Sequence, residues 1–382
     1  MKDETRLTRL GRPHDERGQV NPSVARGSTM LAPSAGQLYN FPPGRVHYGR
    51  VGLETHQALR DALTGLQGGA GCALTSSGLL ANTLSILTAV EAGGRVLAAD
   101  CIYGPVRNFL LDTLPRYGVT AEFFPARMGA VIGDLITPDV QAILLETPGS
   151  LTMEMQDVPA IAAIARDKGV LTIIDDTWSA GLTFKPLQLG VDLAAQALTK
   201  YVGGHSDLLM GAVIARDEAL FKRLQATERS FGLHTAPDDV YLALRGFRSM
   251  AVRMERSFHS SMTVADWLSA RPETGRILHP AHSDHPDNAI FKRDFTGGCG
   301  LFSVEFPGWD IPTSERFLDA LDIFGMGFSW GGYESLAIHC DPQLKRSQPG
   351  RTHDGALIRF AIGLEAPEDL VADIEQALDS LG

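Results

Sequence analysis

The sequence predicts an α/β protein: a large domain with a mostly parallel, doubly wound sheet, followed by a smaller α+β C-terminal domain. Short apolar runs alternate with helical patterns from residue 54 to about 215, as repeated strand–helix–strand units require. The pattern then changes to one long helix and a mixed region beyond it. The 382 residues are enough for two or three domains with ample cores.

Residues 1–53 are rich in Gly and Pro and poor in periodic pattern. Residues 40–50, which read Asn-Phe-Pro-Pro-Gly-Arg-Val-His-Tyr-Gly-Arg, cannot build a core of their own. Such a segment is either disordered or lies over another surface. Its aromatic residues favour the second alternative. We therefore expect an N-terminal arm over residues 1–53 that contacts a neighbouring subunit.

The large domain is predicted over residues 54–245. Apolar residues fall on one helical face from Glu54 to Leu66, and Gly68 and Gly69 end that helix. Further helices are expected at residues 78–90 and 158–167. The expected strands cover residues 71–74, 95–99, 120–124, 142–146, 170–174, 193–198 and 211–215. Ligands of such sheets bind at the carboxyl ends of the strands.

The smaller domain is predicted over residues 246–382. A long helix from about Asp238 towards Leu268 is expected to join it to the large domain. Strands are expected near residues 276–278, 300–306 and 356–362. A last helix should run from residue 367 to 381, because Pro367 suits its first position and acids follow in its first turn.

Composition excludes several classes of function. The net charge of −11 argues against nucleic acid or an anionic membrane as a general partner. The four cysteines are scattered without a CxxC spacing, so neither a zinc site nor a disulfide framework is indicated, and we expect reduced thiols in a cytoplasmic protein. The sequence shows no signal-peptide pattern and no apolar run long enough for a membrane span.

Lys200 and Asp175 are the main candidates for catalysis. Lys200 follows the apolar run 193–198 and precedes a glycine pair, so its stem should be desolvated. Desolvation favours the neutral amine that a Schiff-base lysine needs. Asp175 ends the apolar strand 170–174. Either residue alone fits a surface lysine or a helix cap. Together they favour pyridoxal 5'-phosphate (PLP), whose aldehyde takes a lysine and whose ring nitrogen takes an acid.

Three further pieces fit this interpretation, each with a plainer alternative. Ser77-Gly78-Leu79 lies between a strand and a helix and could cradle a phosphate or simply cap the helix. Tyr103 follows the next strand and could stack on a ring or only pack. Arg359 lies inside an apolar strand and needs a partner, which is either a structural carboxylate or a substrate carboxylate.

Two other stretches bear on ligand binding. Residues 329–334, Ser-Trp-Gly-Gly-Tyr-Glu, should form a loop over the pocket of Arg359, since the glycines let its backbone approach a ligand. His279, His282 and His285 have a spacing that raises the question of a metal. The prolines near them break any regular face and no nearby cysteine completes a ligand set, so we expect no metal there.

With these motifs the chain resembles the PLP-dependent enzymes of cysteine and methionine metabolism, of fold type I, and within them the cystathionine β-lyase branch. The resemblance runs from residues 46–50 to residues 358–365. Asp175-x-Thr177 with Thr199-Lys200-Tyr201 is typical of the wider family. Residues 329–336 narrow the match, because γ-acting relatives typically carry Leu where this chain has Trp330; residues 291–297 and 300–302 also resemble that branch.

The resemblance implies a role for each matching residue. Lys200 would form the bond to the cofactor and act in catalysis together with Tyr103, which would also stack on the ring. Asp175 would pair with the pyridine nitrogen. The expected phosphate ligands are the amides of Gly78 and Leu79, the hydroxyl of Thr199, and Tyr48 and Arg50 of the neighbouring subunit. The expected substrate-binding residues are Arg359, Ser329, Trp330 and, with a less specific match, Tyr241.

Two positions depart from the family pattern. Asp176 stands where Asn is usual, which places a second acid beside Asp175. Ala197 replaces a phosphate-binding serine of γ-acting relatives, so the phosphate site would have one hydroxyl fewer.

The implied activity is α,β-elimination at L-cystathionine, giving homocysteine, pyruvate and ammonia for methionine biosynthesis. Cystine and other S-substituted cysteines are further expected substrates. A cystathionine γ-lyase or γ-synthase, a methionine γ-lyase or a cysteine desulfhydrase would use the same transferase-like scaffold, and a non-catalytic binding protein is a remote alternative. The family also implies a homotetramer built as a dimer of dimers with shared active sites.

Overall fold

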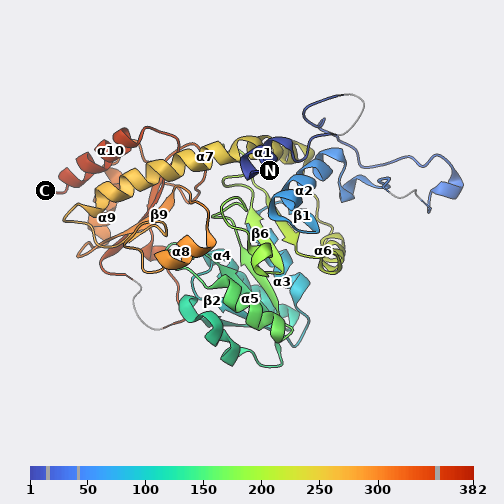
Figure 1. Ribbon diagram of the computed structural model, residues 1–382, viewed down its shortest axis with the longest axis horizontal. Coiled ribbons are helices and arrows are strands. Elements are labelled where there is room, and N and C mark those ends of the chain that lie inside the picture. The colour runs from blue at the N-terminus through green and yellow to red at the C-terminus, as the bar shows by residue number, and fades with distance from the viewer. Residues whose placement is uncertain (14–17, 41–43, 349–352) are drawn as a thin grey trace.

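The computed structural model describes residues 1–13, 18–40, 44–348 and 353–382. Its large sheet has seven strands in the order β1-β7-β6-β5-β4-β2-β3 (Figure 1). Only β7 runs antiparallel to its neighbours. The strands are β1 (Gly71–Thr75), β2 (Arg95–Ala99), β3 (Thr120–Phe124), β4 (Val140–Glu146), β5 (Leu171–Asp175), β6 (Leu193–Ala197) and β7 (Gly211–Ala215). The mostly parallel, seven-stranded sheet is confirmed.

Helices pack on this sheet and fix the positions of its strand ends. Helix α3 contacts β1, β4, β5, β6 and β7 and therefore crosses the centre of one face. The helices of this part are α2 (Glu54–Gln67), α3 (Gly78–Ala89), α4 (Gly104–Asn108), α5 (Val158–Asp167) and α6 (Glu218–Ser230). Short helical turns cover Phe109–Thr113, Leu114–Tyr117, Ala126–Leu135 and Pro186–Leu189.

A second, antiparallel sheet lies in the C-terminal part of the chain, in the order β10-β11-β9-β8. Its strands are β8 (Ile277–Leu278), β9 (Leu301–Phe306), β10 (Leu336–His339) and β11 (Ala356–Ala361), and the helices around it are α8 (Asn288–Asp294), α9 (Ile311–Asp319) and α10 (Pro367–Asp379). This sheet has its own core, in which Phe302, Phe306, Phe317 and Phe360 are fully buried.

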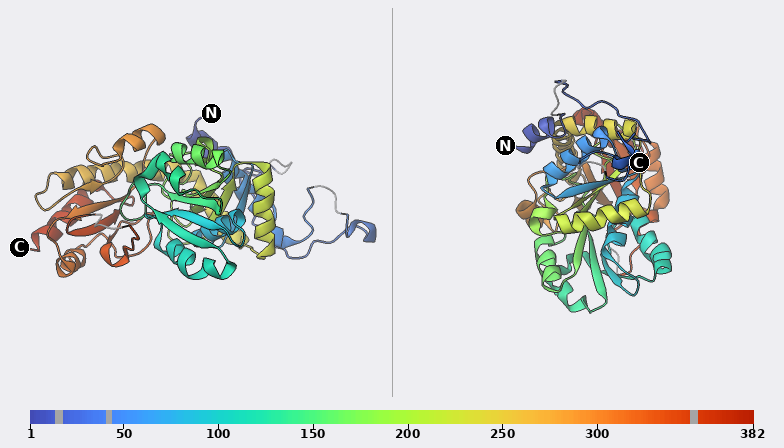
Figure 2. Two further views of the ribbon diagram at one scale, coloured as in Figure 1. Left: turned by 90° about the horizontal axis from the view of Figure 1, so that it is seen from below. Right: turned by 90° about the vertical axis from the view of Figure 1, so that its right-hand side faces the viewer.

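Helix α7 (Pro237–Ser269) connects the two sheets (Figures 1 and 2). Its first half buries Val240, Leu244 and Phe247 in the core of the large sheet, and its second half buries Val264 and Leu268 in the smaller core. The expected joining helix is therefore present. The division into domains at residues 53 and 245 stays a prediction, and its second boundary falls inside α7.

The strand predictions agree with the structure to within two residues, but several short elements were not foreseen. These are α1 (Asp3–Arg9), α6, α8, α9 and β10. Helix α1 has only seven residues, too few for a visible apolar stripe. Tertiary contacts hold it instead: Leu7 is fully buried, Lys185 forms an ion pair with Asp3 at 2.7 Å, and Arg248 donates to the carbonyl of Leu7 at 2.9 Å.

Between α1 and α2 the chain extends outward from the large sheet (Figure 1). Its apolar side chains are unusually exposed, with Leu31 at 82% and Tyr39 at 89%. Short turns at Ala35–Gln37 and Gly49–Val51 interrupt it. Residues 41–43 of the predicted arm lie outside the described residues. That the arm contacts a neighbouring subunit stays a prediction.

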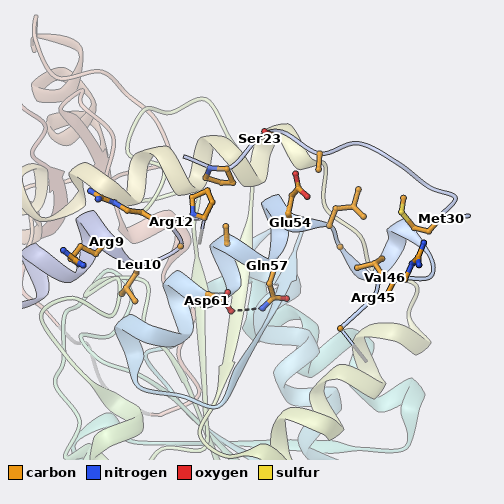
Figure 3. Close-up of a pocket in the computed structure, with 18 of the residues that line it drawn as sticks. Arg9, Leu10, Arg12, Ser23, Met30, Arg45, Val46, Glu54, Gln57 and Asp61 are labelled. Carbon is orange, nitrogen blue, oxygen red and sulfur yellow. Dashed lines mark hydrogen bonds between the residues drawn. The ribbon is translucent and has the colours of Figure 1, made fainter. Parts of the chain in front are cut away.

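The arm, the end of α1 and the start of α2 surround a cavity of about 1470 Å³ (Figure 3). Basic side chains of Arg9, Arg12 and Arg45 line it, together with apolar residues such as Leu10 and Met30. None of the predicted site residues lines this cavity. Among the described helices, none combines the length and apolar character needed to cross a lipid bilayer.

Candidate active site

Lys200 lies in the turn that follows β6, where the sequence predicted it. Its Nζ donates a hydrogen bond to Ser329 Oγ at 2.9 Å and lies 5.3 Å from the centre of the Trp330 ring. Burial, and then the nearby charge of Arg359, lower the pKa of the Lys200 amine to about 8, while Asp175 opposes this. The amine is therefore neutral in part of the molecules near physiological pH, as a nucleophile requires.

Arg359 is buried on β11, and its Nη2 donates to the Ser329 carbonyl at 3.1 Å. Its Nε has no hydrogen-bond partner, and within the described residues no carboxylate forms an ion pair with it. Burial lowers the pKa of this guanidinium. Of the two partners left open by the sequence, the structural carboxylate is therefore absent from the described residues, and the guanidinium is available to an external anion.

Asp175 ends β5 and its carboxylate is held by donors on both oxygens. Oδ1 accepts the backbone N–H of Thr177 at 3.0 Å and also the Thr177 hydroxyl, and Oδ2 accepts Asn82 Nδ2 at 2.7 Å. Burial raises the pKa of Asp175, whereas these hydrogen bonds and the charge of Lys200 act in the opposite direction. The donors thus favour the ionised form that a protonated pyridine nitrogen needs.

Tyr103 follows β2 and remains 45% exposed at the start of α4. Its backbone N–H donates to Glu146 Oε2 at 2.6 Å, so the end of β4 fixes this turn. Burial raises the pKa of the Tyr103 phenol, and the charges of Asp175 and Glu146 add to the effect. The charges of Asp175 and Arg359 thus act on this phenol, and the stacking of its ring on a cofactor stays a prediction.

Glu146 and Asn82 are site residues that the sequence reasoning missed. Glu146 is paired with Asp175 across the parallel strands β4 and β5, and burial and the Asp175 charge raise its pKa well above the usual value. Its position at a strand end, next to Asp175, could have identified it. Asn82 lies four residues after Gly78 on α3, a spacing that places both on one face of the helix.

The N-terminus of α3 has the features of an anion site. Ser77 caps the helix by accepting Leu80 N–H at 3.1 Å, and the amides of Gly78 and Leu79 have no acceptor among the described residues. A Cβ on Gly78 would collide with the Ala197 methyl group, so the helix start lies directly against the end of β6. Free amides at this place can bind a phosphate. The small residue at 197 permits the close approach.

Thr199 is engaged differently from its expected role. Its hydroxyl donates to the Met210 carbonyl at 3.2 Å and accepts the Met210 N–H at 3.0 Å. To donate to a phosphate, the hydroxyl would have to turn away from the Met210 carbonyl. Its contact with the cofactor therefore stays a prediction.

The loop at residues 329–334, which the sequence predicted to lie over Arg359, contacts Arg359 through the Ser329 carbonyl and Lys200 through the Ser329 hydroxyl. Trp330 packs on Tyr201 with ring centres 5.7 Å apart. Gly331 has φ of +80°, and a Cβ there would lie 3.0 Å from the Tyr201 backbone nitrogen. Only glycine suits this conformation and this close approach. The loop thus brings Ser329 and Trp330 over the lysine.

Asp176 directly follows β5, and its carboxylate binds other elements than that of Asp175 does. Its buried carboxylate accepts Gln67 Nε2 at 2.7 Å, Gln196 Nε2 at 3.2 Å and the hydroxyl of Ser179. Burial raises the pKa of Asp176 to about 7. The additional acid is therefore hydrogen-bonded away from Asp175.

Three predicted site residues are not brought to Lys200 within one chain. Arg50 Nη1 donates to the Arg229 carbonyl at 3.2 Å, and Tyr48 is 48% exposed on the arm. Tyr241 lies at the start of α7. Within the described residues, none of the three forms a hydrogen bond or an ion pair with the site residues above. Their roles stay predictions.

The histidine segment is held by local structure. His279, His282 and His285 each accept at Nδ1 the N–H two residues ahead, at 3.1, 3.3 and 3.1 Å. Burial lowers the pKa of both His279 and His285 to about 4. Across the described residues no group of His, Cys, Asp and Glu has a metal-binding arrangement. The four cysteines are free and buried.

These residues together fit PLP. An amine of lowered pKa can bond to the aldehyde, a carboxylate held by three hydrogen bonds can face the ring nitrogen, and two free helix amides can receive the phosphate. The guanidinium of Arg359, whose Nε has no partner, adds a site for a substrate carboxylate.

Comparisons with known proteins agree. A match to the Cys/Met metabolism PLP-dependent enzymes covers residues 4–379. A putative cystathionine beta-lyase of Rhizobium johnstonii is 42% identical over 378 residues, which cover 97% of this chain and 94% of the relative. A cystathionine beta-lyase of Bordetella avium is 40% identical, with coverage of 98% and 97%. The crystal structure of cystathionine gamma-lyase from Lactobacillus plantarum complexed with L-serine has a TM-score of 0.91 and 29% identity, covering 100% of this chain and 99% of that one. The chain belongs to the family of Cys/Met metabolism PLP-dependent enzymes.

Proposed function

We propose that this carbon–sulfur lyase cleaves the Cβ–S bond of L-cystathionine by α,β-elimination, releasing homocysteine, pyruvate and ammonia. The observation that carries the proposal is that Lys200 and Arg359 both bind Ser329, one through its hydroxyl and one through its carbonyl. A base for the Cα proton and a fork for the adjacent carboxylate are therefore held next to each other, as elimination from an amino acid requires. The two β-lyase relatives support the choice of substrate.

Each of the site residues has a separate role in the proposed reaction. Arg359 binds the substrate carboxylate through the N–H groups that the protein leaves free, and this orients Cα. Lys200 would act as the base that removes the Cα proton with its Nζ. The hydroxyl of Ser329 keeps that Nζ in place. When bound, PLP supplies an electron-withdrawing ring that stabilises negative charge at Cα.

Four further residues would support the cofactor. Asp175 would hold the proton on the pyridine nitrogen, with its carboxylate kept ionised by Thr177 and Asn82. Tyr103 would cover the ring, and Glu146 positions Tyr103 through its backbone. The amides of Gly78 and Leu79 would bind the phosphate at the start of α3.

Trp330 favours β- over γ-elimination. Its ring lies 5.3 Å from Lys200 Nζ and packs on Tyr201, so it limits the space in which the amine can move. A γ-elimination needs a proton to be removed from Cβ as well as from Cα, whereas β-elimination needs only the first. A γ-lyase on the same scaffold remains the second candidate because the L. plantarum γ-lyase has closely similar coordinates.

The assembly and compartment belong to the same proposal. Arg50 and Tyr48 lie on an exposed arm, and among the described residues the Arg50 guanidinium donates only to the Arg229 carbonyl. We expect a neighbouring subunit to supply these two residues, within a tetramer built from two such dimers. The four free, buried cysteines are consistent with a reducing cytoplasm.

Product analysis tests the proposed reaction. The purified holoenzyme is incubated with L-cystathionine, and keto acids and thiols are identified by mass spectrometry. We expect pyruvate with one equivalent of homocysteine. The appearance of 2-oxobutyrate with cysteine would instead assign γ-elimination. Cystine and S-alkyl cysteines are assayed in parallel by pyruvate release to rank the thioether substrates.

A further inference from the structure

The carboxylate of Asp175 is held from two sides before any cofactor is considered. Thr177, two residues on, donates its N–H and its hydroxyl to Oδ1. Asn82, on a different element, donates from Nδ2 to Oδ2 at 2.7 Å. A carboxylate offers about four lone-pair positions. With three taken by protein donors, one remains for the pyridinium N–H.

Asn82 is buried, and its side chain has one strong partner. Its exposed fraction is 1%, and its Oδ1 has no hydrogen-bond partner among the described residues. Reversing the amide would point Oδ1 at the Asp175 carboxylate, where the two oxygens repel each other. A buried amide with an unsatisfied oxygen costs stability. The contact with Asp175 therefore fixes the orientation of Asn82 and leaves its Oδ1 without a partner. Such a loss of stability is typical of residues that serve a functional site.

The same nitrogen also reaches the start of α3. Asn82 Nδ2 lies 3.3 Å from the carbonyl of Gly78, one turn earlier on the helix. Gly78 begins the helix whose free amides form the phosphate site, and it packs against Ala197 at the end of β6. One amide thus connects the two ends of the cofactor site, the phosphate cradle and the acid for the ring nitrogen.

We propose that Asn82 is a positioning residue for the cofactor. Asn82 holds Asp175 in its ionised form and at a fixed distance from the N-terminus of α3. This rests on the proposed roles of Asp175 and Gly78 in binding PLP. The titratable groups near Asp175 are Lys200, Glu146 and Tyr103. None of them donates a hydrogen bond to its carboxylate, so Asn82 is the one donor to Oδ2 within the described residues.

The test uses the holoenzyme of Asn82→Leu, which keeps the size of the side chain and removes its donor. The milder Asn82→Ser replaces the amide with a hydroxyl, which can still donate a hydrogen bond but from a shorter side chain. The matched control is Ser85→Ala, since Ser85 is buried on the same helix and its hydroxyl bonds, within the described residues, only to the Ala81 carbonyl. Two quantities are measured without substrate: the dissociation constant of PLP, and the pH at which the enzyme loses its visible cofactor band on acidification.

We expect Asn82→Leu to weaken PLP binding about 10- to 100-fold, the usual effect of losing a hydrogen bond to a charged group. Its acid midpoint should rise, because a carboxylate with one donor fewer accepts a proton more readily. Asn82→Ser should be intermediate and Ser85→Ala unchanged. If Asn82→Leu does not fold, Asn82→Ser decides by the same two quantities.

Wild-type affinity and an unchanged acid midpoint in the Asn82 variants would overturn the proposal. An equal change in Ser85→Ala would also overturn it, because the effect would then be general to α3. Neither readout involves turnover, so an error in the assigned substrate leaves the test unaffected. If none of the variants Asn82→Leu, Asp175→Ala and Lys200→Ala weakened PLP binding, the cofactor site itself would be refuted.

Discussion

At the scale of single residues, burial and the hydrogen bonds that oppose its effect on pKa explain the chemistry of the site. Lys200 is desolvated enough to bring its pKa to about 8, whereas Asp175 receives three hydrogen bonds that oppose the effect of burial. The protein thus favours a neutral base and an ionised acid at the same pH. The sequence predicted both residues because each follows an apolar strand. It could not predict their hydrogen-bond partners, since Asn82 is 93 positions from Asp175.

Asp176 should make stability depend on pH. Its folded-state pKa of about 7 exceeds the ordinary value of 3.8, so the folded protein holds this proton more tightly than the unfolded chain. Stability from this group is therefore greatest below pH 4 and decreases as the pH rises towards 7. The loss has an upper limit of about 4 kcal/mol, since one pKa unit corresponds to about 1.4 kcal/mol.

Asp176→Asn removes this ionisation while Gln67 and Gln196 can turn their amides to bond the new side chain. We expect the thermal midpoint of the variant to rise relative to wild type at pH 8 and to differ less at pH 5. Asp112→Asn, an exposed substitution, serves as the control. A difference between Asp176→Asn and wild type that is the same at both pH values would contradict the assigned pKa.

At the scale of elements, residues 344–348, which follow a strand of the small sheet, are anchored by hydrogen bonds to Asp100, close in sequence to Tyr103. Residues 344–348 follow β10, and the N–H groups of Ser347 and Gln348 donate to the Asp100 carboxylate at 2.9 and 3.0 Å. Asp100 directly follows β2 and forms a buried ion pair with Arg107 at 2.7 Å. Because β11 carries Arg359 in the same sheet as β10, we expect this anchor to help position Arg359, the proposed ligand of the substrate carboxylate.

Asp100→Ala tests that anchor. Removing one partner of a buried ion pair typically costs about 3–5 kcal/mol, so we expect a clearly lower thermal midpoint. We also expect KM for cystathionine to rise more than kcat falls, because Arg359 loses its fixed position. Ser347→Ala should change both less, since it keeps the backbone N–H that donates to Asp100 and loses only the hydroxyl that accepts from Arg107. Equal effects of the two substitutions would contradict this role of Asp100.

Short elements mark the limit of sequence reasoning here. The seven strands of the large sheet were predicted because each is an apolar run between helices. Helix α1 and strand β10 were missed, since seven and four residues carry too little pattern. They form because of distant contacts: Lys185 binds Asp3 in α1, and β11 pairs with β10. Similarly, the sequence could not identify the partner of Arg359. The structure shows that its Nη2 donates to the Ser329 carbonyl.

At the scale of the whole molecule, an exposed arm carries Tyr48 and Arg50, the two phosphate ligands that we expect a neighbouring subunit to supply. Arg50 is bonded only to the Arg229 carbonyl by its guanidinium among the described residues. Two copies that exchange arms would complete each other's sites. Such a two-fold arrangement is the commonest form of soluble oligomer.

Mixing two inactive variants tests this exchange. Arg50→Ala removes the donated cation, and Lys200→Ala removes the base. In a hybrid dimer one site carries both changes and the other carries neither, so random mixing should restore about a quarter of wild-type activity. The variants are co-expressed, and each alone is the control. No recovery in purified hybrids would show that Arg50 acts within its own chain or not at all.

The identity of the cofactor-bearing residue tests the central claim most directly. The holoenzyme is treated with borohydride, which makes the lysine–cofactor bond permanent, and is then digested and mapped by mass spectrometry. We expect the cofactor mass on the peptide that contains Lys200 and on no other. A label on a different lysine, or no label on a protein that still cleaves cystathionine, would contradict the assignment of Lys200.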